Sequence, residues 1–106
     1  MTYEEMLKQA VVVRAKYDQL NERNGVSWND QALMAGFVGD VGALSKIVLA
    51  KNGLRAMDDV DEKLAHELAD CLWSVLVLAD KFGINLANEY QKTMAALNER
   101  IDAKLR

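Results

Sequence analysis

The chain has 106 residues, which is the size of one compact domain, and we expect a single domain over 1–106. Half of the residues are apolar and about a quarter are charged (51% and 27%), as in globular proteins, and the net charge of −3 gives no reason to bind a nucleic-acid polymer. One cysteine, Cys71, and one histidine, His66, exclude an internal disulfide and a zinc site made of thiolates or a histidine cluster.

Two helices are expected in the first half of the chain. Thr2 and Glu5 have the spacing of a capping box, so a helix should begin at the residue after Thr2 and end at Asn24-Gly25. Ser27 is expected to cap a second helix, which should run to about Lys51 before an Asn-Gly pair ends it. Both segments have apolar residues at steps of three and four.

Two further helices are expected in the second half. Asp61 or Asp58 should cap a third helix that runs through Lys81, where Phe82-Gly83 forms a stop signal. Asn85 should cap a fourth helix. Because no segment alternates with a period of two, the sequence predicts an all-α fold, most simply an antiparallel four-helix bundle with short loops.

The third predicted helix is apolar nearly all the way round between residues 71 and 79. Such a helix is covered on more than one side. We expect a partner subunit to pack on Leu72, Trp73 and Leu76, and therefore a homodimer or a dimer of dimers; the alternative is a central helix in a monomer. The run is about half of a membrane span, and the N-terminal MTYEEMLKQ is no signal sequence, so we expect a cytoplasmic protein without membrane contact.

Three carboxylates fall on faces of the predicted helices that should be close to the core. Asp40 lies in the apolar stripe of the second helix, and Glu67 and Asp70 lie one turn apart on the third. Burying a bare carboxylate costs several kcal/mol, so a cluster of three predicts a neutralising cation. Oxygen ligands without cysteine or histidine favour Mg²⁺, with Mn²⁺ as the alternative. Taken alone, Asp40 is more typical of a boundary residue that reaches solvent or forms an ion pair, and the pair Glu67 and Asp70 is as compatible with a solvated helix edge as with a pair of ligands.

These two blocks resemble the MazG-like family of the all-α nucleoside triphosphate pyrophosphatase superfamily. The run ELADCLWSVLVLADKFGINL, residues 67–86, is similar to the block in which that family has an E-x-x-D pair, a Leu-Trp and a Gly-Ile-(Asp/Asn)-Leu. GDVGALSK, residues 39–46, is similar to its first acidic block but less complete. The resemblance covers about residues 28–100 and implies a MazG-like helical bundle completed by dimerisation.

The resemblance also implies a chemistry. It makes Asp40, Glu67 and Asp70 metal ligands for Mg²⁺, with Glu67 and Asp70 as catalytic residues in the hydrolysis of a (d)NTP to a (d)NMP and pyrophosphate. Arg100 would contact phosphate, and Lys92 would substitute for a missing lysine nearby. Trp28, before the second helix, would stack on the nucleobase or else close the end of the bundle as a hydrophobic plug.

The chain departs from the family pattern at three places. Gly39-Asp40 stands where the family has a tandem Glu-Glu. Ala43 stands where the family has the second Glu of its E-x-x-E pair, and Ala96 stands where it has a phosphate-binding lysine. Mg²⁺ needs only one or two protein carboxylates, so three still suffice for one ion. The sequence therefore leaves two functions open: a pyrophosphohydrolase that clears non-standard or surplus nucleotides, or a catalytically impaired relative acting as a nucleotide-binding or regulatory module. Glu89, on the fourth helix, is a candidate for the missing carboxylate.

Overall fold

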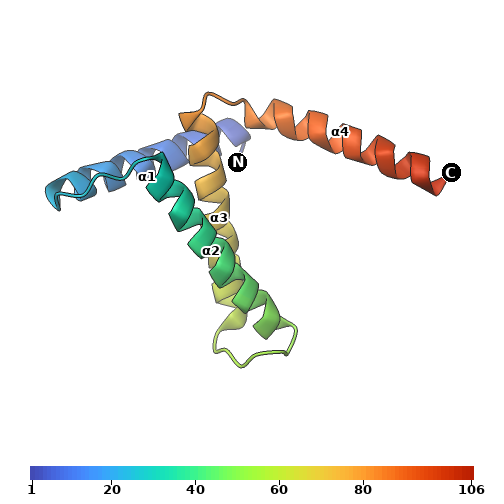
Figure 1. The fold of residues 1–106 in the computed structure, drawn as a ribbon, viewed down its shortest axis with the longest axis horizontal. Helices are drawn as coiled ribbons and strands as arrows, with labels where there is room; N and C mark the ends of the chain where they lie inside the picture. Colours follow the sequence, from blue (N-terminus) through green and yellow to red (C-terminus); the bar gives the residue numbers. More distant parts are fainter.

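The computed structural model describes residues 1–106 and contains four α-helices and no strand, which confirms the predicted all-α class. The helices are α1 (Tyr3–Arg23), α2 (Asp30–Lys51), α3 (Val60–Lys81) and α4 (Leu86–Leu105) (Figure 1). The first three helices each end two residues before a glycine with positive φ, a backbone conformation that glycine adopts without strain; these glycines are Gly25, Gly53 and Gly83.

Most of the predicted helix ends are confirmed. Thr2 and Glu5 form both hydrogen bonds of the capping box at the start of α1, and the Asn85 side chain caps α4. The cap of α2 was misplaced, because Asn29, rather than Ser27, accepts the hydrogen bond from the backbone N–H of Ala32.

The predicted cap of α3 is wrong. Neither Asp58 nor Asp61 occupies that position; Asp59 does, in the left-handed conformation with φ of 51° and without a side-chain capping bond. Its backbone carbonyl accepts the first helical hydrogen bond from Lys63. Asp61 is occupied elsewhere, since its carboxylate pairs with Lys51 at 2.6 Å across the connector between α2 and α3.

The core lies where three helices meet. In Figure 1, α2 and α3 lie side by side and run in opposite directions, while α1 crosses α3 at the end away from the α2–α3 connector. The buried residues at this junction are Ala10, Leu33, Leu76 and Val77. Trp73 joins α3 to α1 as well, because its indole N–H donates to the carbonyl oxygen of Ala10 at 3.2 Å.

The fourth helix takes no part in this packing. α4 contains no buried residue and extends away from the other three helices (Figure 1). Only 8 of the 106 residues are buried, and the radius of gyration is 17.1 Å, against about 13 Å for a compact domain of this length. One chain by itself therefore does not form a closed four-helix bundle.

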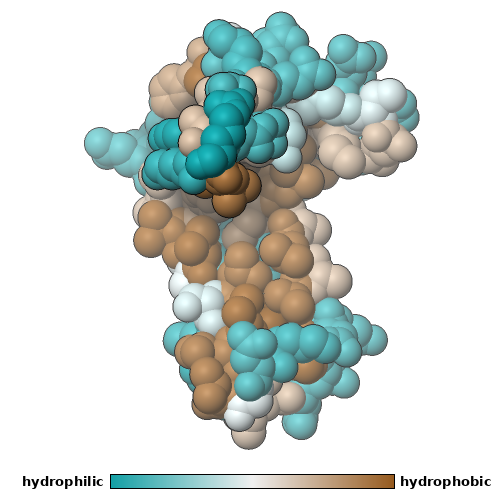
Figure 2. All heavy atoms as spheres, turned by 90° about the vertical axis from the view of Figure 1, so that its right-hand side faces the viewer, coloured by the Kyte–Doolittle hydropathy of each residue, from teal (hydrophilic) through white to brown (hydrophobic).

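The apolar segment of α3 is covered only in part. Trp73 and Leu76, which we expected to meet a partner subunit, pack on α1 of the same chain. Leu72 is uncovered, with 45% of its surface exposed. A space-filling view shows a broad hydrophobic surface on the stem that α2 and α3 form below α4 (Figure 2).

By length and composition, α2 is the one helix that could cross a membrane, with a mean hydropathy of 1.6 over its most apolar window. One such helix is not enough to assign a membrane span, because a core helix of a soluble protein has the same composition.

Replacing Leu33 with alanine should lower the free energy of unfolding by about 2–5 kcal/mol, because Leu33 is only 1% exposed and the truncation leaves a cavity in the core. Leu54→Ala is the matched control, since Leu54 lies in the α2–α3 connector and is 74% exposed. Urea denaturation followed by circular dichroism measures both. Equal losses in the two variants would contradict the packing described here.

Candidate functional site

The three carboxylates that the sequence singled out come together where α2 packs on α3. One carboxylate oxygen from each of Asp40, Glu67 and Asp70 lies within 4.8 Å of the other two. The packing explains why: α2 is held against α3 through buried Leu33 and Ile47, and Asp40 lies between these two residues along the helix. All three side chains are partly buried, so the cluster stays open to solvent on one side.

Glu67 is the inner member of the cluster. One of its oxygens, Oε1, is shielded from solvent and has no hydrogen-bond donor. The pKa of Glu67 is raised above its ordinary value, first by burial and then by the negative charges of Asp40 and Asp70. His66 acts in the opposite direction. Without a cation, the ionised form of Glu67 is therefore destabilised.

Two neighbours border the cluster. His66 is mostly exposed, and its Nε2 lies 3.1 Å from Oδ2 of Asp70. Cys71 follows directly in the chain, and burial together with the charges of the three carboxylates raises the pKa of its thiol. The thiol thus stays protonated at neutral pH and acts as a small partly buried side chain.

A hollow of about 520 Å³ opens beside the carboxylates, between α1, α2 and α3. Asp40, His66 and Asp70 form its polar edge. More than half of its apolar lining residues are aromatic, namely Tyr17, Trp28, Phe37 and Trp73. The ring of Tyr17 packs at a tilt against both indoles, with centroids 6.2 Å from Trp28 and 5.8 Å from Trp73.

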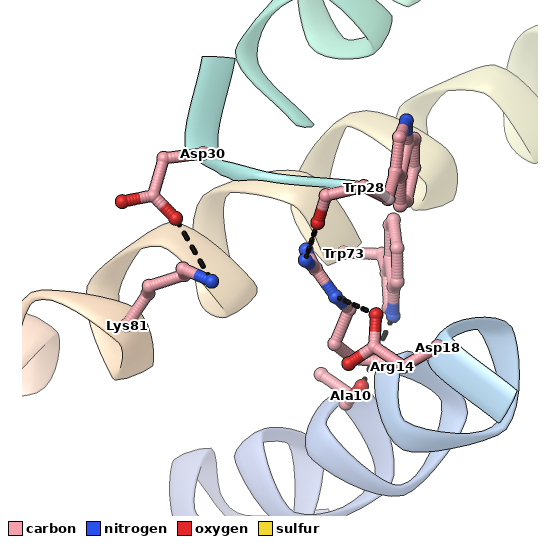
Figure 3. A network of polar contacts seen from close by, with 7 residues as sticks. All are labelled: Ala10, Arg14, Asp18, Trp28, Asp30, Trp73 and Lys81. Atoms are coloured by element: carbon pink, nitrogen blue, oxygen red, sulfur yellow. Dashed lines mark hydrogen bonds and ion pairs between the residues drawn. The ribbon is translucent and has the colours of Figure 1, made fainter. Parts of the chain in front are cut away.

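Trp28 is fixed by a buried arginine, Arg14, that was not among the predicted site residues. Arg14 donates from Nη2 to the carbonyl oxygen of Trp28 at 2.9 Å, pairs with Asp18 at 3.0 Å, and lies over the Trp28 ring (Figure 3). Beyond Trp28, Asp30 pairs with Lys81 of α3 at 2.8 Å. The joint between α1 and α2 is therefore tied down on both sides, and Trp28 is held against the hollow.

This arrangement combines the two roles considered for Trp28. Its ring packs on the core cluster, as a hydrophobic plug would, and it also lines the hollow beside the carboxylates. The signal for Arg14 in the sequence was its position one turn after Ala10 on the buried face, with Asp18 one turn further on. Oppositely charged residues four positions apart on a helix usually form an ion pair on the surface, so the burial of Arg14 was not predicted.

The predicted phosphate contacts lie elsewhere. Lys92 and Arg100 project from α4, which leaves the rest of the chain, and Lys92 pairs with Glu89 at 3.4 Å on that helix. Glu89 is therefore not part of the carboxylate cluster of its own chain. Ala43 and Ala96 are both exposed. Within one chain the structure unites the metal-ligand candidates with Trp28 and leaves the cationic residues apart.

Comparison with protein-family models finds no match, and comparisons with curated proteins and with solved structures find none either.

In metal-free buffer, Glu67→Gln should be more stable than the wild type at neutral pH. A raised pKa means that the folded protein holds its proton on Glu67 to higher pH than the unfolded chain does, so wild-type stability falls as the pH rises from 4.5, the ordinary value, through the folded-state pKa. Glutamine stays neutral and removes this loss. Melting temperatures from pH 4 to 8 with a chelator measure the difference, which should shrink toward the acid end. A wild type more stable than the variant at pH 7 would contradict the repulsion argued here.

Proposed function

We propose that this protein is a Mg²⁺-dependent nucleoside triphosphate pyrophosphohydrolase that converts a (d)NTP to a (d)NMP and pyrophosphate. The observation that carries the proposal is the convergence of Asp40, Glu67 and Asp70 beside a hollow with aromatic walls. The similarity of residues 67–86 to the second MazG-like block supports it. In this proposal the protein is a MazG-like single domain over 1–106, works as a homo-oligomer in the cytoplasm, and has no nucleic-acid or membrane partner.

The carboxylate cluster fits a hard divalent cation. The donors are oxygens only, and the shielded Oε1 of Glu67 has no other partner. Two oxygens on opposite sides of one Mg²⁺ are about 4.2 Å apart, so oxygens within 4.8 Å of one another need only small side-chain adjustments to share an ion. Such an ion, when bound, would polarise phosphoryl oxygens and lower the pKa of a bound water.

The protein's own side chains have separate parts in this proposal. Tyr17, Trp28 and Trp73 offer ring faces on which a nucleobase can stack, and stacking is tolerant of the base. One carboxylate of the Glu67 and Asp70 pair accepts the proton of the attacking water, whose oxygen forms a bond to the α-phosphorus as the bond to the bridging oxygen breaks and pyrophosphate leaves.

A second function has its own supporting observation. Ala43 leaves the first acidic block one carboxylate short, and Glu89 does not replace it within the chain. A missing group that orients water can lower a rate about a hundredfold while binding persists. The alternative is therefore a relative that binds nucleotide with its cation and has a regulatory role.

Metal binding can be tested apart from catalysis. Mn²⁺ or Mg²⁺ should raise the melting temperature of the wild type, since a ligand that binds only the folded state stabilises it. Glu67→Gln should abolish that rise while leaving the circular dichroism spectrum unchanged. Glu62→Gln is the matched control, because Glu62 is an exposed glutamate in the first turn of the same helix. An undiminished rise in Glu67→Gln would remove Glu67 from the ligand set.

Catalysis is tested by incubating the protein with a panel of ribo- and deoxyribonucleoside triphosphates and Mg²⁺ or Mn²⁺. Release of pyrophosphate, not of orthophosphate, is the expected result, because the attack is at the α-phosphorus. Metal-dependent nucleotide binding without pyrophosphate release would favour the regulatory alternative. Orthophosphate as the first product would contradict the proposed reaction.

A further inference from the structure

Two apolar stripes remain without a partner in the chain. The α3 stripe follows one side of α3 at steps of three and four residues and consists of Leu64, Leu68, Leu72 and Val75. The α4 stripe runs the length of α4 and consists of Tyr90, Met94, Leu97, Ile101 and Leu105. The first has two half-buried and two exposed members, and every member of the second is exposed. A helix that is amphipathic but packs on nothing obtains little stability from its apolar side.

We propose that α4 is exchanged between two copies of this chain, so that α4 of each copy lies antiparallel on the α3 stripe of the other and brings its Arg100 to the partner's carboxylate cluster. The two stripes do not meet within one chain, because α4 extends away from α3 (Figure 1). Reciprocal exchange of one element is a common route to a symmetric dimer, and the exchanged helix takes the place that it would occupy in a closed bundle.

When α4 of one copy lies antiparallel on α3 of the other, Arg100 and Glu67 come to the same level along the helix axes. Glu67 lies 14 positions before Lys81, the end of α3, and Arg100 lies 14 positions after Leu86, the start of α4. With a rise of 1.5 Å per residue, both are about 21 Å from the turn that joins two antiparallel helices. In the exchanged dimer the guanidinium and the carboxylate cluster are therefore at the same height.

The residues beside the two stripes also fit antiparallel packing. Counting 3.6 residues per turn, Glu67 and Cys71 lie on one flank of the α3 stripe, and Thr93 and Arg100 lie on the corresponding flank of the α4 stripe. Turning one helix end for end brings corresponding flanks to the same side of the contact, so antiparallel packing directs Arg100 toward the carboxylates and parallel packing directs it away.

Charge favours the same pairing. Asp40, Glu67 and Asp70 have one basic neighbour in their own chain, the exposed imidazole of His66, and Arg100 has no ion-pair partner on α4. Arg100 of a second copy would offset part of the carboxylate repulsion and would present a guanidinium to a phosphate bound there. This role for Arg100 rests on the proposed function, whereas the exchange of α4 does not.

Cross-linking tests the exchange without any assay of activity. One chain keeps its only cysteine, Cys71, and a second, differently tagged chain carries Cys71→Ser with Thr93→Cys on the near flank of the α4 stripe; a short bis-maleimide is added after co-expression. We expect a covalent product that contains both tags. Asn98→Cys is the matched control on the opposite flank, and its yield should be several-fold lower.

Three results would overturn the proposal. The first is equal yields from the Thr93 and Asn98 positions. The second is no product with both tags under conditions in which a monofunctional maleimide labels Cys71. The third comes from a single chain that carries both Cys71 and Thr93→Cys: a product that is mainly of monomer mass would mean that α4 folds back on its own chain.

Complementation tests the delivery of Arg100. Glu67→Gln and Arg100→Gln should each lose activity alone, yet a mixed dimer has one site with both intact residues, so co-expression should restore about a quarter of the wild-type rate if chains pair at random. If both tags cross-link but activity is not restored, the exchange holds and the trans role of Arg100 is wrong. If the wild type has no activity, nucleotide binding in the presence of Mg²⁺ is measured in its place, so failure of the proposed reaction is recognised separately.

Discussion

The packing of α2 against α3 forces three carboxylates together that would otherwise separate. Two unit charges about 5 Å apart repel by about 3 kcal/mol at an effective dielectric constant of about 20, before further solvent screening. That is a large share of the roughly 5–15 kcal/mol by which a domain is stable. The burial of Leu33 and Ile47 on either side of Asp40 offsets this repulsion. The stability of the α2–α3 contact therefore depends on both the buried core residues and the charge of the carboxylate cluster. A cation that neutralises the cluster would strengthen this contact.

The positions of the helices could be predicted from the sequence because their end signals are local. A capping box at Thr2, a cap at Asn85 and glycines after the helix ends act within a few residues of where they stand. Asp59 escaped prediction because a left-handed backbone, without a side-chain bond, starts α3. The direction of α4 could not be predicted either, since its apolar stripe is equally satisfied by its own chain or by another.

The carboxylate cluster could also be predicted from the sequence, but for a different reason. Asp40 interrupts an apolar stripe, and Glu67 and Asp70 repeat at one helical turn, so two adjacent helices had to bring them to one contact. The support around Trp28 was not predictable in this way. Arg14 and Tyr17 reach it across a joint whose conformation is set by tertiary contacts and not by any spacing in the chain.

The grouping of aromatic rings has a spectroscopic consequence. Both tryptophans of the chain, Trp28 and Trp73, line the same hollow and share contact with Tyr17. Nearly all of the protein's intrinsic fluorescence therefore originates from the walls of one space. Emission wavelength and quenching report directly on whether that space is dry, wet or filled, and no label is required.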